Sequence, residues 1–201
     1  MSTLLDAIFS IVIGGIILVF ALRLNVNMNA TVAAKTTSTI AQTNMTTFTD
    51  ILESDLRKAG YNTFVPNLVT LAESTRIRFK GDFNNDNAVD SVQYSISTTP
   101  DAGALNQNAR VIYRTVNNGL PQSIRIGATR LRFWYFDASG NPLAANPSVT
   151  NPVLIRTIKA RVNVELAVEV NTYKKANGTF VSDTTLSSAS WEQTFKPMNL
   201  R

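Results

Sequence analysis

The sequence predicts an α+β protein, in which a long hydrophobic N-terminal helix packs by its C-terminal half on an antiparallel β-sheet. Three observations support this fold class. Residues 1–24 are almost entirely apolar, residues 25–60 regain apolar side chains at helical spacing, and apolar and polar side chains alternate after Gly60. With 44% hydrophobic and 16% charged residues, the chain of 201 residues can bury a core.

The first segment, residues 1–24, is predicted to be a helix in a membrane or an equally apolar environment. Ala7 to Leu22 contains no charged residue, and Ser10 is the only polar side chain between Asp6 and Arg23. A helix from Leu4 to Leu24 is about 31 Å long, which just spans the hydrocarbon core of a bilayer. A soluble helix of this length would carry a polar stripe at a period of 3.6, and this one does not.

The second segment, residues 25–60, is predicted to continue the same helix with an amphipathic character. It contains no proline, and its only glycine is Gly60. Apolar residues recur three to four positions apart and form a stripe suited to packing on a sheet: Met45, Phe48, Leu52 and Leu56. Gly60 follows two basic residues and is placed as the C-terminal cap of the helix.

Residues 61–201 are predicted to form a β-rich head. The alternating stretches are 75–83, 90–97, 109–116, 123–136, 158–170 and 191–197, the first two joined as a hairpin by a long polar loop. In 158–170 one face is entirely apolar and the other carries mainly charged and polar residues, which is typical of an antiparallel strand with one wet side. Segments 141–152 and 174–190 are interpreted as a loop and as a turn or variable loop. Trp134, with Phe133 and Tyr135, is assigned to the core and to cross-strand pairs, and the alternative is a platform for a ligand.

The composition excludes several functions. The chain has no cysteine and no histidine, so disulfides, thiolate zinc sites, and Cys- or His-dependent catalysis are absent. A net charge of +5 without a run of five like charges does not indicate nucleic-acid binding. Glu53 and Asp55 are ascribed to the charged face of the helix, not to acid/base catalysis. We therefore expect a protein that is not an enzyme.

Two motifs resemble those of a known family. "TLLDAIFSIVIGG" (residues 3–15) opens the helix, and "ILESDLRKAGY" (residues 51–61) closes it before the β head. Together with the Asp-rich loop before "SVQYSIS", they resemble the type IV pilin superfamily, most closely PilW-type minor pilins and the J-type pseudopilins of type II secretion. The resemblance covers the whole architecture, and at motif level residues 3–15 and about 51–94.

The resemblance gives Asp6 a role in assembly. Thr3 to Asp6 lie where the family has Thr-Leu-Ile-Glu, so Ser2 corresponds to the first mature residue. The chain differs in having aspartate for glutamate and no basic leader ending in glycine. Either the numbering begins at or near a processed form, or the chain enters the membrane without prepilin processing. In a filament Asp6 would pair with the α-amino group of a neighbouring subunit and set the axial register. The alternative is that Asp6 marks the water boundary of a membrane anchor.

Gly14 and Gly15 also allow two interpretations. They resemble the place where pilin helices lose regular structure in filaments, since glycine weakens a helix. As small residues, they would equally permit close packing between helices.

The loop "GDFNNDNAVDSV" (residues 81–92) is a candidate calcium site. Oxygen ligands recur at alternate positions: Asp82, Asn84, Asp86, the carbonyl of Ala88, and Asp90. Asn87 suits the left-handed conformation that glycine usually supplies. The loop is not an EF-hand, because Gln93 stands where a bidentate glutamate is needed. The alternative is a polar hairpin turn. A bound Ca²⁺ would be structural.

These observations lead to two functional hypotheses. The first is a structural subunit of a type IV pilus-like filament or type II secretion pseudopilus. It would be held in the inner membrane and then assembled, by its machinery, with copies of itself or related pilins into a cell-surface or periplasmic filament. The second is a monomeric, single-span, membrane-anchored β-domain that binds a ligand or partner.

Overall fold

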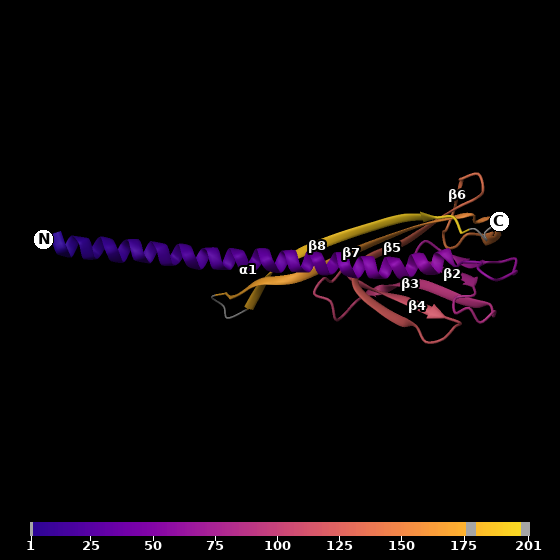
Figure 1. The fold of residues 1–201 in the computed structure, drawn as a ribbon, viewed down its shortest axis with the longest axis horizontal. Helices are drawn as coiled ribbons and strands as arrows, with labels where there is room; N and C mark the ends of the chain where they lie inside the picture. Colours follow the sequence, from indigo (N-terminus) through magenta and orange to yellow (C-terminus); the bar gives the residue numbers. More distant parts are fainter. Residues whose placement is uncertain (1, 176–179, 198–201) are drawn as a thin grey trace. The chain divides into compact units, whose positions relative to one another are not determined.

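A computed structural model describes residues 2–175 and 180–197 of the chain (Figure 1). The fold is α+β, as predicted: one long N-terminal helix is followed by an antiparallel sheet. Its elements are α1 (Ser2–Arg57), β1 (Val69–Ala72), β2 (Arg76–Gly81), β3 (Asp90–Pro100), β4 (Arg110–Val116), β5 (Gln122–Phe136), β6 (Pro142–Leu143), the short 3-10 helix η1 (Pro152–Leu154), β7 (Thr157–Lys174) and β8 (Phe180–Phe195).

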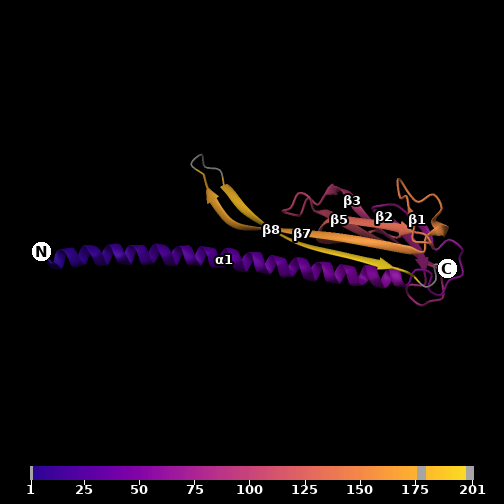
Figure 2. The same ribbon diagram turned by 90° about the horizontal axis from the view of Figure 1, so that it is seen from above.

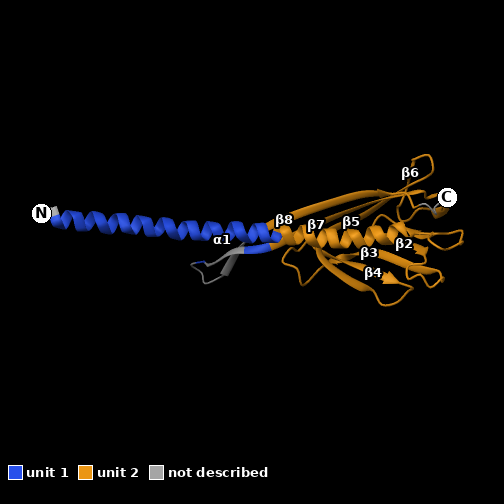
Figure 3. Ribbon diagram, viewed as in Figure 1, with its two compact units in different colours: residues 1–37, 168–185 blue, residues 38–167, 186–201 orange. Residues whose placement is uncertain are grey.

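The chain divides into two compact units, coloured separately in Figure 3. Unit 1 comprises Met1–Thr37 and Val168–Thr185, and unit 2 comprises Ser38–Ala167 and Leu186–Arg201. Helix α1 and strands β7 and β8 each contribute residues to both units. Unit 2 contains the hydrophobic core and the acidic loop, whereas unit 1 contains the apolar N-terminal part of α1.

The end of α1 confirms the predicted cap. The helix ends at Arg57, and Gly60 has a φ of 75°, the left-handed conformation that glycine adopts without strain. Backbone hydrogen bonds then attach the chain beyond the helix to β2: Gly60 N–H donates to the Lys80 carbonyl (2.8 Å) and Asp82 N–H to the Tyr61 carbonyl (3.0 Å). Gly81 lies so close to the helix end that a Cβ there would be 2.4 Å from the Lys58 carbonyl oxygen.

The strands pair in the order β1-β2-β3-β4-β5-β7-β8, and β6 pairs with β5. All the strand pairs from β1 to β7 are antiparallel. The predicted hairpin is confirmed: β2 and β3 pair from Arg76 opposite Ser95 to Gly81 opposite Asp90, and the polar loop connects them. The predicted one-sided strand is also confirmed, since Ile158, Ala160, Val162 and Val164 of β7 are all buried.

The core of unit 2 lies between α1 and one face of the sheet (Figure 2). The predicted stripe supplies the helix side, with Phe48, Leu52 and Leu56 buried and Met45 partly buried. The sheet side is built from alternate residues of the strands, and its largest fully buried members are Ile77, Phe79, Tyr94, Ile112, Leu131, Phe133, Tyr135 and Ile158. The apolar residues of the alternating stretches therefore meet the helix as expected.

The strands differ from the prediction mainly in β8. The prediction placed only residues 191–197 in a strand, whereas β8 runs from Phe180 to Phe195. Its first part reads "FVSDTTLSSAS", a Ser- and Thr-rich sequence without apolar alternation. β8 stands at the end of the strand order, so among the described strands it is an edge strand that pairs with β7 alone. The short strands β1 and β6 were also not predicted, and β6 lies in the segment interpreted as a loop.

Candidate functional site

The N-terminal part of α1 carries an apolar surface that the rest of the described residues do not cover. Its most apolar stretch is not buried at all, and α1 is long and apolar enough to cross a membrane. The exposed side chains include Leu4, Leu5, Ile8, Phe9, Ile11, Val12, Ile13, Ile16, Ile17, Leu18, Val19, Phe20 and Leu22. Such a continuous exposed surface indicates contact with lipid or protein, and the long apolar helix suggests a membrane anchor.

Asp6 is the single carboxylate on this surface. It is exposed, and its backbone carbonyl accepts a hydrogen bond from the Ser10 hydroxyl (2.8 Å). Among the described residues its carboxylate has no ion pair and no hydrogen-bond donor. The first basic side chain in the sequence is Arg23, more than four helical turns away. A cation for Asp6 would therefore come from outside residues 2–22.

Gly14 and Gly15 both lie inside regular α-helix. A Cβ placed at either glycine would meet no atom within 4 Å. No described residue therefore requires glycine at these two positions, and the two interpretations, helix weakening and close packing with another molecule, both stay open.

The acidic loop between β2 and β3 brings its three aspartates together. One carboxylate oxygen from each of Asp82, Asp86 and Asp90 lies within 4.8 Å of the other two. Asp82 and Asp90 are buried, and Asp86 is exposed. Asn87 has a φ of 65°, which confirms its predicted left-handed conformation, and Asn85, with a φ of 61°, shares it. Two such residues curl the backbone around the carboxylates.

Hydrogen bonds within the loop orient its oxygen atoms. The N–H of Asp86 lies 3.2 Å from Asp82 Oδ1 and 3.1 Å from Asn84 Oδ1, and the Ala88 N–H donates to Asp86 Oδ1 (2.7 Å). The Asn62 amide donates to Asp82 Oδ2 (2.8 Å). This bond, helped by backbone N–H groups of the loop, holds the pKa of Asp82 below its ordinary value, although burial acts in the opposite direction.

Neighbouring elements anchor the loop through side chains that the sequence analysis did not single out. Asn117, in the turn after β4, donates to Asp90 Oδ1 (2.6 Å), and Lys58, just past α1, donates to the Phe83 carbonyl (3.1 Å). Within the described parts of the chain, no Lys or Arg side chain forms an ion pair with Asp82, Asp86 or Asp90. Three clustered carboxylates without a paired cation, together with nearby amide and carbonyl oxygens, can provide ligands for a hard cation such as Ca²⁺.

A buried polar network joins α1 to the sheet in unit 2. Asp55 is 7% exposed, so its assignment to the solvated face of the helix was wrong. Glu53, by contrast, is partly exposed and forms an ion pair with Arg57. Asp55 Oδ2 accepts hydrogen bonds from Tyr94 Oη (2.6 Å) and Arg114 Nε (2.8 Å). The sequence could not reveal this network, because Tyr94 and Arg114 lie 39 and 59 positions from Asp55 in the chain.

The buried tyrosines should make unit 2 sensitive to alkali. Burial, reinforced by nearby acidic groups, raises the pKa values of Tyr94 and Tyr135 above the ordinary 10.0. In the unfolded chain both phenols ionise near pH 10, whereas in the fold they stay protonated, so their contribution to stability is complete below about pH 10 and is lost above it. As the pH is raised from about 9 to about 11, we expect the urea concentration at the unfolding midpoint to fall. It should fall less in a Tyr94→Phe/Tyr135→Phe variant. A midpoint independent of pH in this range would contradict the prediction.

The architecture defines the class of protein: a long apolar N-terminal helix packed on an antiparallel sheet, which is compatible with a pilin-like fold. No protein-family profile matches the sequence, and no curated protein matches it. The class is therefore set by architecture alone.

Proposed function

We propose that the chain is a structural subunit of a type IV pilus-like filament, with PilW-type minor pilins and J-type pseudopilins as its nearest resemblance. The observation that carries this proposal is the uncovered apolar surface of α1, exposed over residues 3–24 and interrupted by the single carboxylate of Asp6. A membrane accounts for the apolar surface. A bundle of identical helices accounts for the surface as well, and it would offer the acid a partner in the α-amino group of a neighbouring subunit.

The proposed mechanism has two stages. The inner membrane first holds the subunit by residues 4–24, with Asp6 near one end of the span. There an ionised carboxylate costs less than the about 2.5 to 3.5 kcal/mol that it costs at the centre. The assembly machinery then transfers the helix into the filament, where the helices pack together and the β-rich head faces outward. The finished filament would be on the cell surface or in the periplasm.

Asp6 would set the register of the packed helices. In the filament core, its carboxylate would pair with the free α-amino group of a neighbouring subunit, since side-chain cations do not occur in residues 2–22. A neighbour displaced along the axis would leave this buried charge unpaired, which costs several kcal/mol. One ion pair per contact would thus favour a single stagger of the helices.

The test is microscopy of sheared material from cells that produce the full chain. Negative staining should reveal filaments, and mass spectrometry should identify this chain in them and report where its N-terminus begins. If the chain stays entirely in the membrane fraction and no filament contains it, the alternative is favoured. In that case the protein is a monomeric, single-span, membrane-anchored β-domain that binds a ligand or partner.

We further propose that the acidic loop binds a structural Ca²⁺ ion through Asp82, Asn84, Asp86, the Ala88 carbonyl and Asp90. The support is the convergence of three carboxylates within 4.8 Å on a loop held by two left-handed asparagines. The ion would offset the mutual repulsion of these carboxylates and fix the loop between β2 and β3. It would have no catalytic role.

Calcium should therefore stabilise the protein. At about 100 times its dissociation constant, Ca²⁺ should add about 2.7 kcal/mol to the free energy of unfolding of the full chain in detergent. Asp86→Ala should abolish this increment. Asp137→Ala is the matched control, because Asp137 organises a similar polar turn without other carboxylates and should leave the increment intact. Equal melting of the wild type in calcium and in chelator would refute the site.

A further inference from the structure

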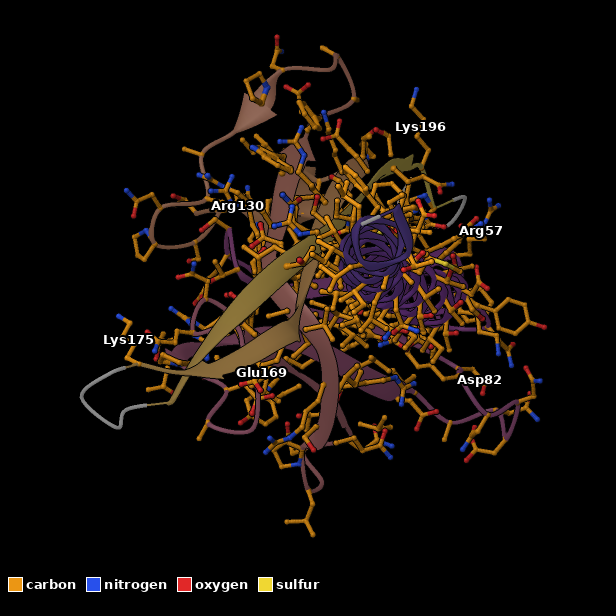
Figure 4. The ribbon with its side chains drawn as sticks, turned by 90° about the vertical axis from the view of Figure 1, so that its left-hand side faces the viewer. Arg57, Asp82, Arg130, Glu169, Lys175 and Lys196 are labelled. Carbon is orange, nitrogen blue, oxygen red and sulfur yellow. The ribbon has the colours of Figure 1, made fainter. Side chains whose placement is uncertain are left out.

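The outer face of the sheet in unit 2 carries a cluster of cations around Trp134. Strand alternation turns Leu131, Phe133 and Tyr135 of β5 into the core and Arg130, Arg132 and Trp134 outward. Trp134 is only partly buried, so its assignment to the core was wrong, whereas its assignment to a cross-strand pair is confirmed by Lys159 of β7. Figure 4 shows Arg130 on the side of the sheet away from α1.

The register between β5 and β7 concentrates positive charge. Arg132 stands directly opposite Arg161, and Trp134 stands opposite Lys159. The charged groups of Arg132, Lys159 and Arg161 lie 5.6, 5.6 and 5.4 Å from the centroid of the Trp134 ring, within the range of cation–π attraction. Trp134 therefore holds three cations together.

Among the residues that the structure describes, one carboxylate offsets this charge. Glu192 of β8 pairs with Lys159 (2.5 Å) and with Arg161, and the pairing keeps the pKa of Glu192 low. Among the described residues, Arg130 and Arg132 have no acidic partner. Like charges placed directly opposite each other destabilise a sheet, and the core on the other face does not require them. A bound anion would offset the repulsion between these cations.

A groove adjoins the cluster. Its volume is about 490 Å³, a size typical of small-ligand sites, and it lies between β5 and the loop after β6. It is lined by Arg132, Phe133 and Trp134 of β5, by residues 143–146, and by Ser74. The hydroxyl of Ser74 and the amide of Asn146 have no hydrogen-bond partner within residues 2–175 and 180–197. The groove thus combines the guanidinium of Arg132, which has no acidic partner among the described residues, with the polar groups of Ser74 and Asn146, which can bind hydroxyls.

We propose that this groove, with Arg132, Lys159 and Arg161 beside it, binds the acidic sugar of a uronate-containing polysaccharide. Arg132 would pair with the carboxylate, and Ser74 and Asn146 would bind ring hydroxyls. A single-stranded nucleic acid fits less well. Its bases need a free aromatic face, and three cations already surround the Trp134 ring. The proposal is independent of filament assembly, because every residue involved belongs to unit 2 of one chain.

The test is calorimetric titration of the full chain, in detergent, with a galacturonic acid trimer, the neutral galactose trimer and a single-stranded oligonucleotide. The acidic trimer should bind, and the neutral trimer should bind at least tenfold more weakly. Arg132→Gln should weaken binding of the acidic trimer about ten- to a hundredfold, as expected for the loss of a charge-assisted hydrogen bond, and Ser74→Ala should weaken it about two- to tenfold.

Arg57→Gln is the matched control, because Arg57 is exposed on α1, away from the groove, and the substitution removes the same charge. It should leave binding within twofold of the wild type. Three results would overturn the proposal: equal affinity for the neutral and acidic trimers, an equal effect of Arg57→Gln and Arg132→Gln, or tighter binding of the oligonucleotide. All variants should unfold at the wild-type midpoint, which excludes loss of fold as the cause.

Discussion

Asp55→Ala is expected to lower the free energy of unfolding of unit 2 by about 3 to 5 kcal/mol, the loss typical of breaking one side of a buried ion pair. The substitution removes the carboxylate that receives hydrogen bonds from Tyr94 and Arg114. The Arg114 side chain, 20% exposed, would keep its charge without a partner. Urea unfolding followed by tryptophan fluorescence measures this loss, since Trp134 and Trp191 both lie in unit 2.

Two further variants make the measurement specific. Glu53→Ala removes a carboxylate from the same helix, but from a partly exposed pair with Arg57, and should change stability by about 0.5 kcal/mol or less. Asp55→Leu/Arg114→Leu removes both charges and should recover much of the loss, because no buried charge remains unpaired. If Asp55→Ala costs no more than Glu53→Ala, the network does not hold α1 to the sheet.

Asp6→Ala is expected to abolish filaments while the chain still inserts into the membrane. In the proposed filament, the neighbour's α-amino group would be left buried without its counter-charge. A loss of about 3 kcal/mol at each contact lowers the association constant by more than a hundredfold, and it recurs at every subunit. The measurement compares the amount of chain in sheared filaments with the amount in the membrane fraction.

Asp6→Glu keeps the charge and should retain assembly, whereas Asp6→Asn should behave like Asp6→Ala. Asp50→Ala serves as the control for loss of a carboxylate from α1 outside the apolar stretch, since Asp50 is exposed. Normal filaments with Asp6→Ala would mean that Asp6 only marks the boundary of the membrane span. A chain that forms no filaments in any variant is described by the anchored β-domain hypothesis.

The parts of the fold that the sequence predicted depend on local patterns. The stripe of Phe48, Leu52 and Leu56 fixes which side of α1 is buried, and the left-handed Gly60 fixes where the helix ends. In the acidic loop, the spacing of Asp82, Asp86 and Asp90 predicted that their carboxylates converge, and Asn87 has the left-handed conformation expected of it. These features follow from residues within a few positions of each other, where helical and strand periods operate.

The features that escaped prediction depend on distant partners. In the sequence alone, Asp55 cannot be distinguished from other charged residues of the helix, because its partner Arg114 is 59 positions away. The outward orientation of Trp134 follows from the local alternation of β5, but the cations Lys159 and Arg161 beside its ring come from β7 and could not be read from its own stretch of sequence. The polar first part of β8 is a strand because β7 provides a partner, although its own sequence has no alternation. In each case tertiary contacts outweigh local propensity.

The attachment of the helix end to β2 has a mechanical consequence. The bonds from Gly60 N–H to the Lys80 carbonyl and from Asp82 N–H to the Tyr61 carbonyl join the two segments on either side of the close approach at Gly81. A pull along α1 would be transmitted to the sheet through these bonds and through the ion pair of Asp55 with Arg114, and not through the covalent chain alone. These contacts tie the helix end to the sheet beside the acidic loop, so tension on α1 would be shared between them and the packed stripe of Phe48, Leu52 and Leu56.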